Sequence, residues 1–150
     1  MLNPDFREML SALSTENVEF LVVGAYAMAA HGFPRATGDL DIWVRPGEEN
    51  AQRVWRALER FGAPRSRVTA ADFQTPDVVF QIGAAPRRID LITSIDAVTF
   101  EEAWCDRKQI EVEGQPLSVI SFEHLLRNKR ACGRPKDLAD AAWLEQGRET

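Results

Sequence analysis

The stretch ATGDLDIWV, residues 36–44, has the character of a buried strand that is interrupted by two aspartates. Leu40 and Ile42 suit the interior of a sheet, whereas Asp39 and Asp41 carry charge. Because side chains alternate along a strand, both carboxylates are expected on the same face. Two like charges side by side repel each other and are costly to remove from water, so the pair needs a functional explanation.

A third aspartate stands in another apolar segment, RRIDLIT, residues 87–93. If this segment and residues 39–44 form neighbouring strands, Asp39, Asp41 and Asp90 converge on one face of a sheet. Such a cluster is poorly stable unless cations neutralise it, and carboxylate oxygens are ligands that suit Mg²⁺ or Mn²⁺. The three aspartates are therefore a predicted divalent-metal site.

Pairing with arginine is the alternative for any one of these aspartates. Arg35, Arg87 and Arg88 stand close to them in the sequence and are available as partners. Asp-x-Asp together with a third aspartate in a later strand favours metal binding over three separate ion pairs.

The remaining periodicity predicts helices alternating with strands. Helices are expected at residues 3–16, 25–32, 45–62, 99–104, 121–133 and 134–146. Strands are expected at residues 18–24, 39–44, 77–83 and 87–94, and a hairpin at 108–121. This order predicts an α+β fold, an α/β sandwich with a mixed β-sheet flanked by helices and a C-terminal helical segment, in a single domain over residues 1–150.

Composition excludes several classes of protein. With 150 residues and a net charge of -5, the chain is not expected to coat nucleic acid through charge alone. No apolar run is long enough to cross a membrane, and MLNPDFREML lacks the pattern of a signal peptide. Cys105 and Cys132 are isolated, so reduced thiols in a cytoplasmic protein are expected.

A candidate anion site precedes the two aspartates. The stretch VVGAYAMAAHG, residues 22–32, places a strand end, Gly24 and the start of a helix in succession. That order offers backbone N–H groups to a phosphate, and Mg²⁺ held by few protein ligands commonly serves a phosphate substrate. The stretch matches neither the Walker A loop nor the pattern GxGxxG.

These segments together resemble a known family. VGAYAMAAHGFPRATGDLDIWV (residues 23–44), followed by RIDLIT (88–93), resembles the DNA polymerase β-type nucleotidyltransferase superfamily. More narrowly, the chain is similar to small bacterial proteins related to AbiE-type abortive-infection toxins and to minimal nucleotidyltransferases. The tail LLRNKRACGRPKDLADAAWL (125–144) resembles the closing helices of that group. Ala25 stands where the family often has serine, which removes a hydroxyl and leaves the backbone N–H groups.

The resemblance implies transfer of a nucleoside monophosphate from an NTP, such as ATP, to an acceptor hydroxyl, with release of pyrophosphate. Asp39 and Asp41 would bind two Mg²⁺ or Mn²⁺ ions that bridge the triphosphate. Asp90 would ligate the catalytic metal and help to activate the acceptor hydroxyl. The predicted nucleotide contacts are Gly24, Ala25, Arg35, Thr37, Lys129 and Lys136.

Two functions remain open at this stage. The first is an active nucleotidyltransferase whose acceptor is an RNA end (such as that of a tRNA), a protein side chain or a small molecule such as an antibiotic. The second is a non-catalytic module of the same fold that binds a nucleotide or a partner protein, for example within a toxin–antitoxin pair. The intact set of three aspartates favours the first, and Ala25 favours the second.

Overall fold

Six strands form one mixed sheet, and the strand that carries Asp41 is one of its two central strands. The structure, a computed structural model, describes residues 2–34, 38–84 and 87–149. The order across the sheet is β3-β4-β2-β1-β6-β5. The strands are β1 (Phe20–Val23), β2 (Leu40–Val44), β3 (Val79–Ile82), β4 (Ile89–Ile92), β5 (Lys108–Val112) and β6 (Gln115–Val119).

Strand directions make the sheet mixed, as predicted. β2 runs antiparallel to β1 and parallel to β4, and β1 runs parallel to β6. The edge strands β3 and β5 pair antiparallel with β4 and β6. The predicted hairpin at residues 108–121 is the β5–β6 pair, and Gly114 has the positive φ that its turn requires.

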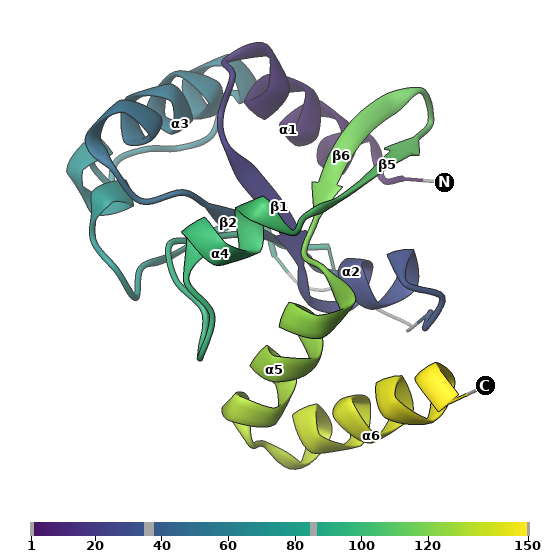
Figure 1. Ribbon diagram of the computed structural model, residues 1–150. Coiled ribbons are helices and arrows are strands. Elements are labelled where there is room, and N and C mark those ends of the chain that lie inside the picture. Colours follow the sequence, from purple (N-terminus) through teal and green to yellow (C-terminus); the bar gives the residue numbers. More distant parts are fainter. Residues whose placement is uncertain (1, 35–37, 85–86, 150) are drawn as a thin grey trace.

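Helices pack around the sheet, and the last two of them form the C-terminal part of the chain (Figure 1). They are α1 (Pro4–Thr15), α2 (Gly24–Ala30), α3 (Glu48–Phe61), α4 (Phe100–Cys105), α5 (Phe122–Cys132) and α6 (Pro135–Glu149). The sequence predicts all six, and the α+β fold is confirmed. Among the described residues, none of the helices has both the length and the apolar character needed to cross a membrane. The single-domain organisation stays a prediction.

One element is absent from the sequence prediction. A short 3-10 helix, η1, spans Ala70–Gln74 between α3 and β3. Thr69 and Asp72 form a capping box at its start, and the backbone N–H of Thr69 donates to Asp72 Oδ2 at 2.8 Å. The spacing Thr-x-x-Asp is the signal that could have revealed it, but a single turn has no hydrophobic periodicity to support it.

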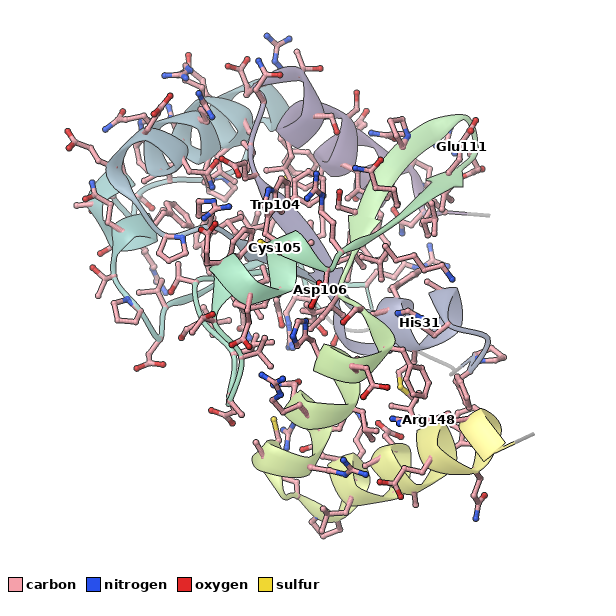
Figure 2. The ribbon with its side chains drawn as sticks, viewed as in Figure 1. His31, Trp104, Cys105, Asp106, Glu111 and Arg148 are labelled. Carbon is pink, nitrogen blue, oxygen red and sulfur yellow. The ribbon has the colours of Figure 1, made fainter. Side chains whose placement is uncertain are left out.

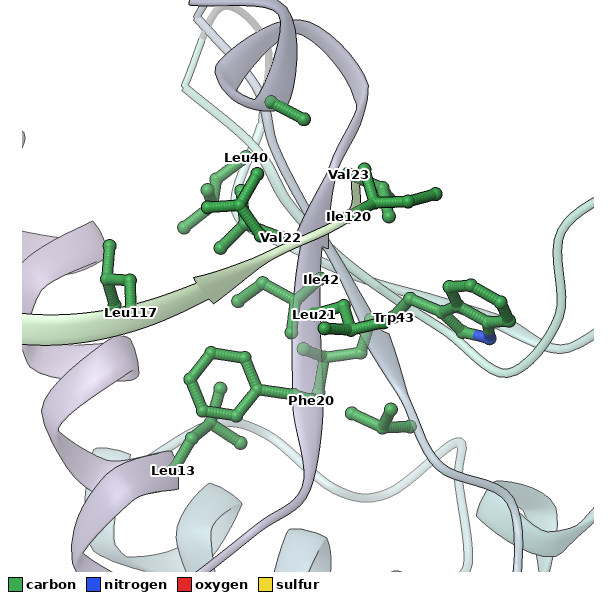
Figure 3. Close-up of a cluster of buried hydrophobic side chains, with 14 of the residues drawn as sticks. Leu13, Phe20, Leu21, Val22, Val23, Leu40, Ile42, Trp43, Leu117 and Ile120 are labelled. Atoms are coloured by element: carbon green, nitrogen blue, oxygen red, sulfur yellow. The ribbon is translucent and has the colours of Figure 1, made fainter. Parts of the chain in front are cut away.

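The core fills both faces of the two central strands. Phe20 of β1 lies beside Leu13 of α1 on one face, and Trp43 of β2 lies on the other (Figure 3). Trp43 is 1% exposed and packs edge-to-face on Phe100 of α4, with ring centroids 5.0 Å apart. Because β2 alternates, Asp41 and Trp43 share a face, and Leu40 and Ile42 occupy the opposite one.

The helical hairpin of α5 and α6 is attached to the loop that follows α2. Phe33, which is 9% exposed, packs on Phe122 of α5 and Trp143 of α6, with centroid distances of 6.2 and 5.2 Å. His31 at the end of α2 lies beside the start of α5 (Figure 2), and its Nε2 is 2.8 Å from the carbonyl oxygen of Ile120. These contacts attach α5 and α6 to the end of α2 and to Phe33, which follows it.

A buried amide joins β1, β2 and α3. Asn50 is 4% exposed, and its Oδ1 accepts from the backbone N–H of Glu19 at 2.8 Å. Its Nδ2 donates to the carbonyl oxygens of Glu19 at 3.1 Å and Arg45 at 2.9 Å. Asn50 therefore satisfies three backbone groups where β1 begins and β2 ends.

We expect Asn50→Ala to lower the free energy of unfolding by about 2–3 kcal/mol, because it leaves partly buried backbone groups without partners. Urea denaturation followed by circular dichroism measures the change. Gln52→Ala, at an exposed position of the same helix, is the matched control and should change stability by less than about 0.5 kcal/mol. Equal losses in the two variants would contradict this role of Asn50.

Candidate active site

The pairing of β2 with β4 brings the three aspartates close together, as the sequence predicts. These strands are parallel neighbours, and Asp41 is directly paired with Asp90 in the register. Neighbouring strands lie about 4.8 Å apart, so the two side chains project side by side from one face. Asp39 immediately precedes β2 and is two residues from Asp41, which places it on the same side. The structure thus brings the three predicted carboxylates together.

A cleft of about 500 Å³ opens over these aspartates. Its walls come from the end of β1, the start of α2, β2–β4, α5 and α6. Charged side chains dominate the described lining, and Val79, Ile92 and Ile95 add an apolar section. The acidic members are Asp39, Asp41, Asp90, Asp96, Asp137 and Asp140, and the basic members are Arg88, Lys129, Arg134 and Lys136.

Arg88 binds two of the three central carboxylates. Its Nε donates to Asp90 Oδ1 at 2.7 Å, and one terminal nitrogen donates to Asp90 Oδ2 at 3.1 Å. The same terminal nitrogen lies 3.4 Å from Asp39 Oδ2, and the backbone N–H of Arg88 donates to Asp39 Oδ1 at 3.0 Å. The aspartate–arginine pairing that the sequence left open is therefore present for Asp39 and Asp90.

Asp41 experiences the accumulated negative charge of the cluster. Burial of its carboxyl, followed by the negative charges of Asp90 and Asp39, raises the pKa of Asp41 from 3.8 to about 6. The positive charges of Arg88 and Lys129 oppose this rise only in part. The site therefore has a deficit of positive charge that a bound cation would relieve.

Gly24 lies directly against Asp41. It is the first residue of α2, with φ +69°, and a Cβ atom placed there would lie 2.2 Å from Asp41 Oδ2. Glycine is thus required both by the left-handed backbone and by the approach of the carboxylate. Gly24 and its neighbour Ala25 line the cleft beside Asp41, and their role as nucleotide contacts stays a prediction.

Lys129 of α5 is held in the cleft by two carboxylates of α6. Its Nζ lies 3.1 Å from Asp140 Oδ2 and 3.6 Å from Asp137 Oδ1, and its side chain is 11% exposed. Burial alone would raise the pKa of Asp137, but the hydrogen bond from Arg134 and the charge of Lys129 bring it below its ordinary value. Asp137 therefore stays ionised, and together with Asp140 it orients the ammonium group.

Arg88, Asp137 and Asp140 are site residues that the sequence analysis did not select. Asp137 and Asp140 are both 1% exposed and share the buried face of α6 with Ala141 and Leu144. Their helical spacing with these apolar residues could have marked them as buried carboxylates that need partners. Arg88 was considered only as a partner for an aspartate.

The remaining predicted contacts have different outcomes. Lys136 lines the cleft from the first turn of α6 and is exposed. Arg35 and Thr37 lie outside the described residues.

The two cysteines are both free. Cys132 lines the cleft, whereas Cys105 lies at the end of α4 (Figure 2).

The donor chemistry of the site fits a divalent cation, with one condition. Three carboxylates and the raised pKa of Asp41 indicate unmet demand for positive charge. As the described side chains stand, however, no three His, Cys, Asp or Glu residues form a group that could hold a metal ion. Asp39 and Asp90 are turned to Arg88 instead. A metal ion must therefore compete with this guanidinium for its ligands.

Comparison with known proteins identifies the fold. No protein-family model matches the chain, and no curated protein sequence matches it. Among solved structures, the chain is similar to the Thermotoga maritima protein TM1012, described as a candidate nucleotidyltransferase, with 18% identity and a TM-score of 0.63. This likeness covers 97% of the chain and 96% of TM1012.

The antibiotic-resistance factor ANT(2'')-Ia is a second structural neighbour. Its solution structure shares 17% identity at a TM-score of 0.63, covering 95% of the chain and 82% of ANT(2'')-Ia. Its crystal structure in complex with adenylyl-2''-tobramycin shares 19% identity at a TM-score of 0.60, covering 95% and 86%. The chain therefore has the fold of the nucleotidyltransferases.

We expect Asp41→Asn to stabilise the metal-free protein at pH 8 by about 1–3 kcal/mol. A raised folded-state pKa means that the Asp41 contribution to stability is most favourable at acid pH. This contribution is lost as pH rises from 3.8 to about 6. Urea denaturation in EDTA at pH 4 and pH 8 should therefore show a gain that is larger at pH 8. A gain that does not depend on pH would contradict the raised pKa.

Gly24→Ala should lower the free energy of unfolding by about 1–2 kcal/mol more than Gly32→Ala does. Both glycines have positive φ, but a Cβ at Gly32 meets nothing within 4 Å, whereas one at Gly24 meets the Asp41 carboxylate. Chemical denaturation of the two variants separates backbone strain from the collision with Asp41. Equal losses would show that the close approach contributes nothing.

Proposed function

We propose that this protein is a metal-dependent nucleotidyltransferase that moves a nucleoside monophosphate from an NTP to an acceptor hydroxyl. The nucleotidyltransferase fold supports the reaction class. The observation that carries the proposal is the in-register pair of Asp41 and Asp90, with Asp39 beside it, in a cleft that also contains Gly24 and Lys129. Bound cations would neutralise the mutual repulsion of the three carboxylates, and the cations would in turn bind the phosphate groups of the substrate.

Asp39, Asp41 and Asp90 are the proposed ligands of Mg²⁺ or Mn²⁺. When bound, the ions would neutralise phosphate charge and make the acceptor oxygen a better nucleophile. Asp41 and Asp90 supply hard oxygen donors from two adjacent strands, which hold them more rigidly than loops would, and Asp39 adds a third from the residue before β2.

The proposed reaction is an in-line displacement at the α-phosphorus. The acceptor oxygen forms a bond to the α-phosphorus, and the bond from that phosphorus to the oxygen shared with the β-phosphate breaks. Pyrophosphate leaves with the electron pair of the broken bond, and Asp90 receives the proton of the acceptor hydroxyl. Both oxygens of Asp90 accept hydrogen bonds from Arg88 in the structure, so this role requires Arg88 to move.

Basic side chains on the opposite wall are the proposed contacts of the triphosphate. Lys129 is oriented by Asp137 and Asp140, and Lys136 is exposed at the cleft. The backbone N–H groups of Gly24 and Ala25 are the proposed contacts on the side of α2. Arg35 and Thr37 remain predicted contacts from the loop before Asp39.

A small molecule with hydroxyl groups is the acceptor that the comparisons support best. One structural neighbour was solved with an adenylylated aminoglycoside, and a chain with net charge -5 has little general attraction for RNA. An RNA end and a protein side chain stay among the predictions. So do the narrower resemblance to AbiE-type toxins, a toxin–antitoxin partner and the cytoplasmic location.

The test is transfer of label from each α-³²P-NTP with Mg²⁺ or Mn²⁺. The acceptors are total RNA, cell lysate and a panel of polyhydroxylated small molecules that includes aminoglycosides. We expect Asp39→Asn and Asp41→Asn each to lower transfer at least about a hundredfold, because a metal-binding carboxylate contributes several kcal/mol at the transition state. Thin-layer and gel separation of the products identify the acceptor class.

Glu111→Gln is the matched control for this experiment. Glu111 is exposed on the edge strand β5, in the β5–β6 hairpin (Figure 2). The described lining of the cleft includes no residue of this hairpin, so neutralisation of Glu111 should leave transfer unchanged. Equal activity of the aspartate variants and the wild type would contradict the proposed metal ligands.

A non-catalytic module is the second candidate function. Two observations favour it: Ala25 lacks a side-chain donor for phosphate, and Arg88 already satisfies Asp39 and Asp90 without metal. Absence of transfer to every acceptor, together with absence of metal-dependent NTP binding, would support this alternative over the enzyme.

A further inference from the structure

We propose that Arg88 is an internal counter-ion that competes with divalent metal for Asp39 and Asp90, and that the triphosphate of the substrate relieves this competition by binding the guanidinium. Metal and NTP would then bind cooperatively, and each would bind weakly alone. This inference rests on the proposed function, because it concerns the same carboxylates, and it adds the residue that couples the two ligands.

The guanidinium of Arg88 lies against both Asp90 and Asp39. Arg88 stands two residues before Asp90, next to the start of β4, so both side chains lie on the same face. The guanidinium forms a bidentate salt bridge with Asp90, with nitrogen–oxygen distances of 2.7 and 3.1 Å. One of its terminal nitrogens also lies 3.4 Å from Asp39 Oδ2. It thus contacts two of the three proposed ligands at once.

This pairing of Arg88 competes with metal binding at the same carboxylates. A guanidinium that donates hydrogen bonds to both oxygens of Asp90 occupies oxygen lone pairs that a metal ion needs for coordination. The guanidinium and the metal ion are also both positively charged, so they repel each other at one carboxylate. With this pairing in place, the described side chains form no group of three that could hold a metal ion, although three carboxylates face one cleft. Metal binding therefore requires the guanidinium to leave at least one carboxylate.

The side chain of Arg88 can leave these carboxylates while its backbone stays fixed. This side chain is 31% exposed and lines the cleft, so it has room to turn. The backbone N–H of Arg88 donates to Asp39 Oδ1 at 3.0 Å, and its carbonyl oxygen accepts from the backbone N–H of Leu40 at 2.9 Å. A guanidinium released into a cleft that holds a triphosphate gains an anion for which its planar fork is suited.

Cooperative binding of metal and triphosphate follows from this competition. The triphosphate stabilises the released position of Arg88, so it raises the affinity for metal, and by reciprocity metal raises the affinity for triphosphate by the same factor. Removal of the guanidinium should raise the affinity for metal in the absence of nucleotide. It should also reduce the further increase in metal affinity that the nucleotide causes.

The experiment measures Mn²⁺ binding by isothermal titration calorimetry, first without nucleotide. We expect Arg88→Gln to bind Mn²⁺ at least about fivefold more tightly than the wild type, at the lower end of common coupling factors. Arg88→Lys keeps the charge but loses the planar fork, so its affinity should lie between the two. If circular dichroism shows that Arg88→Gln does not fold, the Mn²⁺ affinity of Arg88→Lys relative to the wild type is the test.

Arg134→Gln is the charge-matched control. Arg134 lines the same cleft, but its guanidinium pairs with Asp137 of α6 at 2.6 Å. Its removal should change the Mn²⁺ affinity by less than twofold. If Arg134→Gln tightens Mn²⁺ binding as much as Arg88→Gln does, general charge and not competition at Asp39 and Asp90 is responsible, and the inference is overturned.

A second titration adds a non-transferable ATP analogue with a methylene group between the α- and β-phosphorus atoms. The analogue should tighten Mn²⁺ binding to the wild type more than to Arg88→Gln. Unchanged or weaker Mn²⁺ binding by Arg88→Gln, with metal-dependent transfer intact in the wild type, would overturn the inference and leave the proposed function standing. Absence of Mn²⁺ binding in every variant, with and without the analogue, would overturn both.

Discussion

The parallel pairing of β2 with β4 is the constraint on which the candidate site depends. It places Asp41 and Asp90 side by side in the register, and Asp39 follows from its position two residues before Asp41. The apolar neighbours of these aspartates are buried on the opposite face of the sheet, so a slip of one residue would move the carboxylates into the apolar core and the core residues into the cleft. The packing of the core thus maintains a repulsive arrangement that the aspartates alone would not adopt.

The rest of the cleft is arranged around this concentration of negative charge. Gly24 allows the start of α2 to approach Asp41, and Arg88 partly neutralises the other two carboxylates. On the facing wall, the buried Asp137 and Asp140 orient Lys129 toward the cleft. Such a site costs stability in the empty protein, and binding sites commonly accept this cost because ligands supply the missing interactions.

Arg88 separates two interpretations of the same three aspartates. In the described conformation it makes Asp39 and Asp90 members of ion pairs, which suits a protein that only keeps the fold of an enzyme. The same contacts suit an enzyme whose metal site forms fully when the substrate arrives, because one side chain can exchange carboxylates for phosphate. The affinity for metal without nucleotide is the property that differs between these interpretations.

The sequence by itself determined most of the secondary structure, the mixed sheet and the three aspartates, because apolar periodicity, helix caps and charges within apolar strands are local signals. It did not reveal η1, which is too short to have a periodicity of its own. Alternation along β4 already favours Arg88 over Arg87 as the partner of Asp90. Only the tertiary structure decided that Arg88 also reaches Asp39, because that contact requires β2 and β4 to pair. The same holds for Lys129, whose partners Asp137 and Asp140 lie on the next helix and reach it only when α5 and α6 pack together. Contacts between elements depend on packing across the whole chain, and local sequence carries no direct record of them.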